Sequence, residues 1–371
     1  MHFTQSTAGT PVNQLLRHRF GVNYTPSLNW WFCWNDFNPE AIARDLDVIA
    51  SLNMDHIRIM LIWPSFQPNE AWVSPAHLDR LDQLMTLAGE RNLDVMATML
   101  TGWLSGWNFK PPFENGSIYS APRMIAAEEL YFREVAKVLK PHSNFLGFDL
   151  GNELNCCWMP EDLATGDAWM DKTLTLLETL CPGQVHVNGV DHAPWFSPCA
   201  FSAKALANRQ KIVALHAWTL FTGAIDRGGP LGAASLKLSA GMAALARAYA
   251  GDAAKPIWIQ EYGATEEWMT KDELPLYVEQ TTLNAINQGV SWFTWWDSHD
   301  VDRKFHFTSL EYGLGLITAD NRVKEYARAY QSLAQTYGGK PVTMPPAKET
   351  PPLPEIPTHE TTWKWLLEWM D

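Results

Sequence analysis

The chain has 371 residues and carries 28 Lys and Arg against 41 Asp and Glu, a formal net charge of −13. Hydrophobic residues make up 46% of it, which excludes disorder as the main state, and the acidic balance argues against a nucleic-acid partner because phosphate binding needs a basic surface. No apolar run reaches the ~18 residues of a membrane span, so no membrane partner is expected.

Short β-type runs alternate with longer amphipathic stretches about eight times along the chain. Asn38-Pro39 and Ser74-Pro75 each open a helix, with a capping residue followed by proline at the first helical position. The expected strands cover residues 20–24, 56–61, 94–100, 145–151, 185–188, 212–216, 257–261 and 290–295, and further helices cover 124–139, 169–180, 203–208, 236–250, 272–287 and 322–337.

Eight strand–helix units predict an α/β fold, a (β/α)8 TIM barrel, over residues 1–337. An open doubly wound sheet is less compatible, because the first expected strand is followed by G-V-N-Y-T-P and not by a Gly-rich phosphate turn. Residues 338–371 hold seven of the 24 prolines and end in an apolar helix. We expect this segment to form a Pro-rich strap and a short helix that packs on the barrel, or on a second subunit of a homo-oligomer.

The N-terminus has no apolar stretch typical of a secretory signal, so we expect a cytoplasmic protein, with a processed secreted chain as the alternative. Five cysteines without a C-x-x-C pair predict neither a disulfide framework nor a zinc site.

Two glutamates end expected strands, Glu153 the fourth and Glu261 the seventh. In a TIM barrel the carboxyl ends of the strands meet at one mouth, where the active site lies. Two carboxyl groups facing each other there are what hydrolysis of a glycosidic bond requires, because one protonates the leaving oxygen while the other attacks or activates water.

Glu153 lies in the segment F-L-G-F-D-L-G-N-E-L-N, Glu261 lies in K-P-I-W-I-Q-E-Y-G, and a Trp-rich eighth strand follows. With Arg58 on the second strand and His216-x-Trp218 on the sixth, residues 20–337 resemble the retaining β-glycosidases of glycoside hydrolase clan A, most of all family 5. The segment after the third strand, residues 100–113, is similar to the β-mannosidase and β-mannanase members.

The resemblance implies that Glu153 is the general acid/base and Glu261 the nucleophile, held ionised by Arg58. Their carboxyl groups should then lie ~5–5.5 Å apart. Asn152 should bond the sugar 2-hydroxyl, and no metal or cofactor is implied. The remaining expected substrate-binding residues are His216, Trp218, Trp295, Trp296, Trp103, Tyr24 and Asp297, with either Trp295 or Trp296 beneath the reacting sugar.

The chain departs from the family at two positions. Trp103 stands after the third strand, where many members carry His, and Trp218 replaces the strand-six Tyr whose hydroxyl bonds the nucleophile. The indole N–H of Trp218 can supply that contact, or Tyr24 or Tyr262 can take it over. Asp297, His299 and Asp300 are expected to form a hydrogen-bonding substrate rim, with a small cation site as the alternative.

The sequence therefore predicts a retaining glycosidase whose partner is a β-linked oligosaccharide, with exo-β-mannosidase the favoured activity. Endo-β-1,4-mannanase, β-glucanase and β-glucosidase are the alternatives within the family, and a non-catalytic carbohydrate-binding barrel lies outside it. A Schiff-base aldolase is disfavoured because no expected strand core carries Lys. Twelve of the 19 tryptophans fall at or beyond strand ends, which predicts a ring of flat platforms around the sugar.

Overall fold

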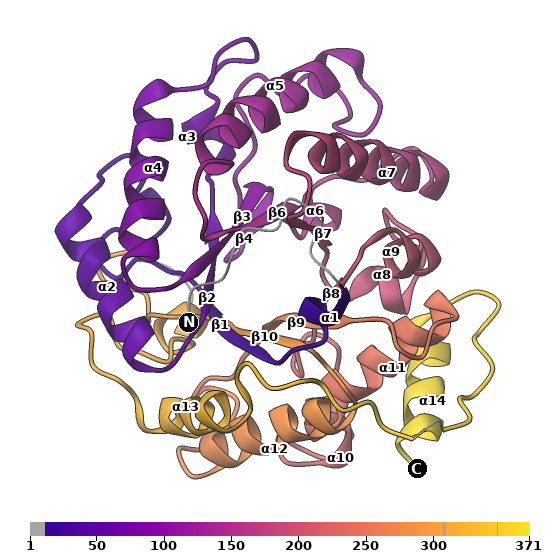
Figure 1. The fold of residues 1–371 in the computed structure, drawn as a ribbon. Coiled ribbons are helices and arrows are strands. Elements are labelled where there is room, and N and C mark those ends of the chain that lie inside the picture. Colours follow the sequence, from indigo (N-terminus) through magenta and orange to yellow (C-terminus); the bar gives the residue numbers. More distant parts are fainter. Residues whose placement is uncertain (1–11, 307–308, 347) are drawn as a thin grey trace.

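The computed structural model describes residues 12–306, 309–346 and 348–371, and within them the chain forms the predicted (β/α)8 barrel (Figure 1). The eight parallel strands are hydrogen-bonded in the order β7-β6-β3-β2-β1-β10-β9-β8, and β7 and β8 lie against each other to close the ring. They are β1 (Arg19–Asn23), β2 (His56–Met60), β3 (Asp94–Leu100), β6 (Phe145–Asn152), β7 (Val185–Gly189), β8 (Val213–His216), β9 (Ile257–Tyr262) and β10 (Trp292–Trp295).

Each predicted strand corresponds to an observed one, and the helices surround the ring (Figure 1). The long helices are α2 (Pro39–Ser51), α4 (Pro75–Gly89), α5 (Pro122–Leu139), α7 (Leu163–Leu180), α11 (Leu238–Ala250), α12 (Glu273–Asn287) and α13 (Glu325–Tyr337), and α9 (Ala203–Arg209) is shorter. Single-turn elements are α1 (Val12–Leu15), α3 (Trp63–Phe66), α6 (Leu154–Cys157), α8 (Ala193–Phe196), α10 (Ala233–Leu236) and the 3-10 turns η1 (Trp30–Phe32), η2 (Ile225–Arg227) and η3 (Ser309–Tyr312).

The two predicted helix caps behave differently. Asn38 accepts a hydrogen bond from the Ala41 backbone N–H at 2.8 Å, as a capping residue should. Ser74 makes no such bond, because its hydroxyl pairs with the His77 ring at 2.8 Å. The proline at the first position of α4 is therefore the local signal that sets its start.

The apolar core has two parts. The larger lies between the strands and the surrounding helices, and the smaller fills the barrel interior at the end opposite the strand carboxyl termini. Trp258 and Trp292 are the largest side chains of the smaller core, and their rings lie 5.3 Å apart. This packing leaves the other end of the barrel to polar side chains.

A two-stranded hairpin after β3 was not predicted from the sequence. It consists of β4 (Trp103–Leu104) and β5 (Trp107–Asn108), and its two turn residues, Ser105 and Gly106, both have positive φ, +52° and +81°. Such a turn matches the twist of a tight hairpin, and the Ser-Gly pair is its sequence signal. The tip of the hairpin lies against η1 and η3, because Ser105 is hydrogen-bonded to Trp31 and Glu311.

The C-terminal segment lies along the barrel and ends in α14 (His359–Met370), beside α11 in Figure 1. Thr358 and Thr361 cap this helix reciprocally. Its apolar face is buried against α8, α10 and α11 of the same chain, and Leu366 and Met370 pack where Gly241 leaves room. The buried residues of α14 are Thr362, Trp363, Trp365, Leu366, Trp369 and Met370.

Trp363 connects this helix to a loop at the barrel mouth. Its indole N–H donates to the Thr222 carbonyl at 2.8 Å, and the Arg227 guanidinium lies 4.5 Å from its ring centre. We expect Trp363→Ala to lower the free energy of unfolding by about 3–5 kcal/mol, because it deletes a large buried ring. Denaturant unfolding measures this loss, with Lys364→Ala on the exposed face as the matched control. Equal midpoints for the two variants would contradict the prediction.

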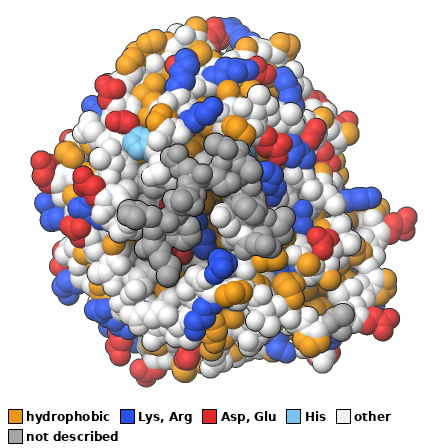
Figure 2. All heavy atoms as spheres, viewed as in Figure 1, with side chains coloured by type: hydrophobic (Ala, Val, Ile, Leu, Met, Phe, Trp, Pro, Cys, Tyr) orange, Lys and Arg blue, Asp and Glu red, His pale blue; other side chains and the backbone are white. Residues whose placement is uncertain are grey.

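The face in Figure 2 carries acidic and basic side chains mixed around its periphery, as expected for amphipathic helices with solvated outer sides. None of the helices in the described part of the chain is long and apolar enough to cross a membrane. Residues 1–11, on which the expectation about a secretory signal rests, lie outside the described residues.

Candidate active site

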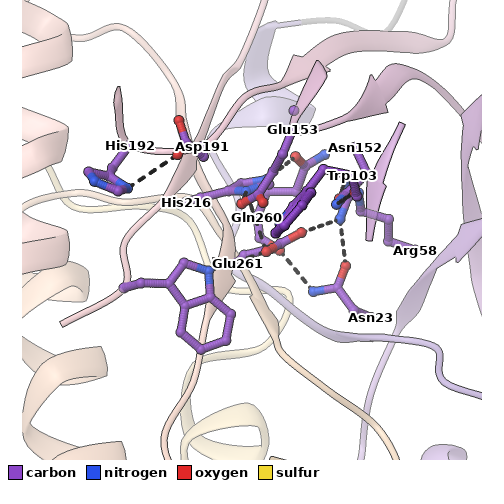
Figure 3. A network of polar contacts seen from close by, with 12 residues as sticks. Asn23, Arg58, Trp103, Asn152, Glu153, Asp191, His192, His216, Gln260 and Glu261 are labelled. Carbon is purple, nitrogen blue, oxygen red and sulfur yellow. Dashed lines mark hydrogen bonds and ion pairs between the residues drawn. The ribbon is translucent and has the colours of Figure 1, made fainter. Parts of the chain in front are cut away.

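A bulge in β9 turns two consecutive side chains toward the barrel axis. Successive residues of a regular strand point to opposite faces, but the register of β9 shifts against both β8 and β10 near Gln260 and Glu261. Gln260 and Glu261 consequently both reach His216 at the end of β8. This places the Glu261 carboxyl between His216 and Arg58 in the polar network (Figure 3).

Glu153 reaches the same place through its backbone conformation. It follows β6 with φ +48°, in the left-handed region, which costs a non-glycine residue about 1–2 kcal/mol. Its N–H donates to the Gly189 carbonyl at 2.8 Å, which ties the turn to β7. The Glu153 side chain lies over Glu261 in Figure 3.

Arg58 organises the polar floor of the site and is fully buried. One terminal nitrogen donates to Glu261 Oε1 at 2.7 Å and to Asn23 Oδ1 at 2.9 Å. The other donates to Asp149 Oδ2 and Asn152 Oδ1, both at 2.7 Å. Five donors in a planar fork allow one guanidinium to fix four oxygen-bearing side chains at once.

His216 joins the two glutamates. Its Nδ1 lies 2.8 Å from Glu153 Oε1 and 3.3 Å from Glu261 Oε2, and its Nε2 lies 3.1 Å from Gln260 Oε1. The Gln260 amide nitrogen faces Asp149 at 3.4 Å, so its oxygen must accept from the His216 Nε2–H. Nδ1 is then the acceptor of the neutral ring, positioned for a proton carried by Glu153.

The electrostatics agree with that proton position. Burial, followed by the negative charge of Asp191, raises the pKa of Glu153 to about 8. Burial also raises the pKa of Glu261; His216 and the Arg58 cation, which lies 2.7 Å away, oppose this rise, while the charge of Glu153 adds to it. Burial lowers the pKa of His216, which keeps its ring neutral. We therefore place the one shared proton on Glu153 and the negative charge on Glu261.

Single ligand atoms of Glu153, His216 and Glu261 lie within 4.8 Å of one another. Carboxyl groups this close suit direct attack on a sugar, because an inverting enzyme separates them by about 6.5–9.5 Å to admit a water. A cation could use the same three atoms. Both oxygens of the Glu261 carboxylate already accept hydrogen bonds, one from the Arg58 guanidinium and one from the Trp218 N–H. The three side chains are therefore better suited to exchanging a proton than to binding a metal ion.

Trp218 takes the place expected of the family's tyrosine, since its indole N–H donates to Glu261 Oε2 at 3.2 Å. The alternative through tyrosine is wrong. The Tyr24 hydroxyl donates to Asp45 at 3.0 Å on α2, and the Tyr262 hydroxyl pairs with Thr282 at 3.1 Å on α12. Both rings point outward from the barrel, so the expected substrate contact of Tyr24 does not form.

Trp295 ends β10 and Trp296 follows it, and their side chains face opposite ways. Trp295 is fully buried and packs against Tyr326 and Tyr330 of α13. Trp296 faces the mouth, with its ring 6.5 Å from that of Trp218. Trp296 is therefore the floor candidate, and the prediction for Trp295 is corrected.

The expected polar rim after β10 is also wrong. Asp297 is fully buried and accepts a hydrogen bond from Thr25 at 2.5 Å. His299 is buried between Ser298 and Asn321, and Asp300 pairs with Lys324 at 2.5 Å. Asp297 and His299 have no access to solvent and so cannot line an open cleft, and Asp300, whose side chain is 13% exposed, is held by Lys324. All three groups join the loops to each other.

The predicted ring of tryptophan platforms is largely wrong as well. Nine of the twelve are buried and pack loops together, while Trp103 and Trp268 are partly exposed and Trp107 is 37% exposed. Trp103 contacts the polar network through its backbone, because its carbonyl accepts a hydrogen bond from Asn152 Nδ2 at 2.7 Å. The tryptophans thus build the walls of the site more than they present open faces.

Four polar contributors were not assigned from the sequence. Asp149, Gln260 and Asn23 hold Arg58 and His216, and Asp191 faces Glu153. A charged residue inside the apolar run of β6 was the available signal for Asp149. Gly189 makes room for this layer, because a Cβ there would lie 2.5 Å from Gln260 Oε1 and 2.7 Å from Asp149 Oδ2.

A TIM barrel whose mouth holds this carboxyl pair defines the class of a glycoside hydrolase. No protein-family model matches this chain, and no curated protein does. Solved structures do: a GH5_18 from Streptomyces cattleya, in complex with GlcNAc, is 30% identical with a TM-score of 0.88, over 95% of this chain and 90% of that one. The chain belongs to glycoside hydrolase family 5 and is a retaining glycosidase.

Two further structures extend the comparison. A GH5_18 from Bifidobacterium longum subsp. longum is 28% identical with a TM-score of 0.86, over 95% of this chain and 89% of that one. The exo-beta-1,4-mannosidase Op5Man5 from Opitutaceae bacterium strain TAV5 is 23% identical with a TM-score of 0.77, over 89% of this chain and 62% of that one, and so supports the fold alone.

Proposed function

We propose that the chain is an exo-acting β-mannosidase that removes one terminal β-mannosyl residue from short β-mannosides, with Manβ1-4GlcNAc as the model substrate. The observation that carries exo action is an aromatic wall at the barrel mouth. It consists of Trp30 and Phe32 from the loop after β1, Trp107 from the hairpin after β3, and Phe305 from the loop after β10. Their ring centres lie 5.7–6.1 Å apart in five contacting pairs.

The wall supports exo action because it bridges three loops that an endo-acting enzyme must keep apart to admit a polymer. The proposal that the sugar is mannose is based on the ligands bound to two similar proteins. A variant of the Streptomyces cattleya GH5_18 and a variant of the Bifidobacterium longum GH5_18 are both in complex with Manβ1-4GlcNAc. A disaccharide with one sugar on each side of the scissile bond suits a site closed on one side.

In the proposed reaction Glu261 attacks the anomeric carbon while Glu153 protonates the leaving oxygen. The resulting glycosyl ester on Glu261 is then hydrolysed by a water that Glu153, now ionised, deprotonates. Two displacements at one carbon restore its original configuration. Asn152 Oδ1 accepts a hydrogen bond from Arg58, and one of its amide N–H groups donates to the Trp103 carbonyl. Its second N–H is then available to donate to the sugar 2-hydroxyl.

The test compares nitrophenyl β-mannoside, β-glucoside and β-galactoside with Manβ1-4GlcNAc and polymeric mannan. We expect the highest kcat/KM on the β-mannosides, a single mannose as the released sugar, and little action on the polymer. Proton NMR of the first product should show the β-anomer before mutarotation. Activity confined to the polymer supports an endo-β-mannanase and overturns the proposal, as does a preference for the β-glucoside.

The pH dependence of kcat/KM should report the proton on Glu153. The protonated form is the active one, so kcat/KM should fall about tenfold per pH unit above the free-enzyme pKa of about 8. Asp191→Asn removes a negative charge that favours protonation, and should move this falling limb to lower pH. Asp252→Asn, at an exposed position, is the control. If the falling limb of the kcat/KM profile lies at the same pH in Asp191→Asn as in the wild type, the limb does not report the proton on Glu153.

A further inference from the structure

One buried carboxyl at the mouth takes no part in the proposed reaction. Glu311 lies on η3, in the loop after β10, and its exposed fraction is 5%. Its Oε2 accepts a hydrogen bond from the Ser105 hydroxyl at 3.1 Å, and Ser105 in turn accepts from the Trp31 indole N–H at 3.0 Å. Its Oε1 accepts no hydrogen bond within the part of the chain that the structure describes, and it is not among the fully buried oxygens that lack a partner, so it has access to solvent.

These contacts bring together the same three loops that form the aromatic wall. Trp31 belongs to η1 after β1, Ser105 is at the tip of the hairpin after β3, and Glu311 follows β10. The Trp31 ring also lies 6.1 Å from that of Trp296, the floor candidate for the reacting sugar. Glu311 is thus fixed in the wall of the site, through two neighbours, with one carboxylate oxygen uncommitted.

Glu311 lies within electrostatic reach of the nucleophile. Burial raises its pKa to about 7, and the charge of Glu261 adds to the rise while the Ser105 hydroxyl opposes it. A carboxylate accepts several hydrogen bonds, and the described residues supply Glu311 with one, from Ser105, which leaves Oε1 to water or to a ligand. A hydroxyl-bearing ligand would supply the missing donor.

The direction of the reaction defines which part of the sugar faces this wall. Glu153 protonates the glycosidic oxygen, so the leaving group lies on the Glu153 side and the sugar ring extends from there past Glu261. The end of a pyranose ring opposite its anomeric carbon carries the 4-hydroxyl. The loops that hold Trp31, Ser105 and Glu311 are joined to one another beside Trp296, so a sugar ring stacked on Trp296 can point its 4-hydroxyl at them.

We propose that Glu311 accepts a hydrogen bond from the 4-hydroxyl of the non-reducing terminal sugar and thereby selects for a chain end. This inference rests on the proposed exo action. A terminal sugar has a hydrogen to donate from O4, whereas a sugar extended through a 1,4-linkage has only an ether oxygen there. A site built to bond a hydroxyl discriminates strongly against a substrate that lacks it, because the buried acceptor is left unpaired.

The experiment measures kcat/KM on nitrophenyl β-mannoside and on its 4-deoxy and 6-deoxy analogues, for the wild type, Glu311→Gln and Glu311→Ala. In the wild type we expect loss of the 4-hydroxyl to cost about 10- to 100-fold. In Glu311→Ala the 4-deoxy sugar should react within about threefold of the parent mannoside, because the acceptor and the donor are then both gone. Glu90→Ala, an exposed glutamate on an outer helix end, is the matched control and should keep the wild-type ratio.

Two results overturn the inference while leaving the proposed function intact. One is a 4-deoxy penalty of equal size in the wild type and in Glu311→Ala, and the other is a cost borne by the 6-deoxy sugar instead. A uniform loss on all three substrates with a lowered unfolding midpoint assigns Glu311 to loop packing alone, and also overturns it. A wild type that does not hydrolyse the parent mannoside overturns the proposed function itself.

Discussion

Glu261→Gln is expected to lower kcat on nitrophenyl β-mannoside about 10⁴- to 10⁶-fold, since the variant has no carboxylate to form the glycosyl ester. Glutamine has nearly the same shape, and its amide can still contact Arg58 and Trp218, so the unfolding midpoint should change little. The loss then belongs to the chemistry and not to the fold. Glu266→Gln, at an exposed carboxyl in the loop after β9, should retain wild-type activity.

Stereochemistry distinguishes the nucleophile from any other essential carboxyl. In Glu261→Gly, azide can enter the vacated space and attack the anomeric carbon in a single displacement. The product should be the α-mannosyl azide, formed from a substrate with an activated leaving group. Turnover of Glu261→Gln within tenfold of the wild type, or formation of the β-azide by Glu261→Gly, would show that another group attacks the sugar.

Glu153→Ala is expected to produce the second large loss, and its size should depend on the leaving group. General acid catalysis contributes about 10²- to 10⁴-fold where the leaving oxygen needs a proton, as in Manβ1-4GlcNAc. A dinitrophenyl mannoside leaves without protonation, so its first displacement should proceed nearly as in the wild type. Deglycosylation should then become rate-limiting, because no base remains to activate water, and a burst of dinitrophenol should precede slow turnover.

Azide again tests the assignment, with the opposite stereochemical result. In Glu153→Ala it attacks the glycosyl ester on Glu261 as the second of two displacements, so the β-mannosyl azide should accumulate and the steady-state rate should rise. The falling limb of kcat/KM above pH 8 should also disappear, because its titrating group is absent. Equal losses on good and poor leaving groups would refute the role of Glu153 as general acid.

The two glutamates differ although their carboxyl groups lie close together. Glu261 receives Arg58 at 2.7 Å, whereas Glu153 faces Asp191 and the lone pair of a neutral His216. A cation favours the charged form of one carboxyl and an anion favours the protonated form of the other. The neighbours of each glutamate therefore favour Glu261 as the proposed nucleophile and Glu153 as the proposed acid.

Local pattern was sufficient for the barrel and for the carboxyl pair. Eight β-type runs, each followed by an amphipathic stretch, favour a closed parallel sheet surrounded by helices. The carboxyl ends of all eight strands then lie at one mouth of the barrel. Glu153, Glu261, Arg58 and Asn152 could be found because each ends or interrupts an apolar run. Strand alternation alone could not orient Trp295 and Trp296, because it needs a register, and register comes from the neighbouring strands.

Tertiary structure decided the features that depend on partners distant in the sequence. The bulge in β9 brought Gln260 beside Glu261, and α2 captured the Tyr24 hydroxyl through Asp45. The cluster of Trp30, Trp107 and Phe305 joins three loops separated by long stretches of chain. The sequence by itself determined the fold and the pair of carboxyl groups that we propose act on the sugar. The side chains that surround this sugar could be identified only from the tertiary structure. Contacts between loops that are distant in the sequence produce no periodic pattern of apolar and polar residues.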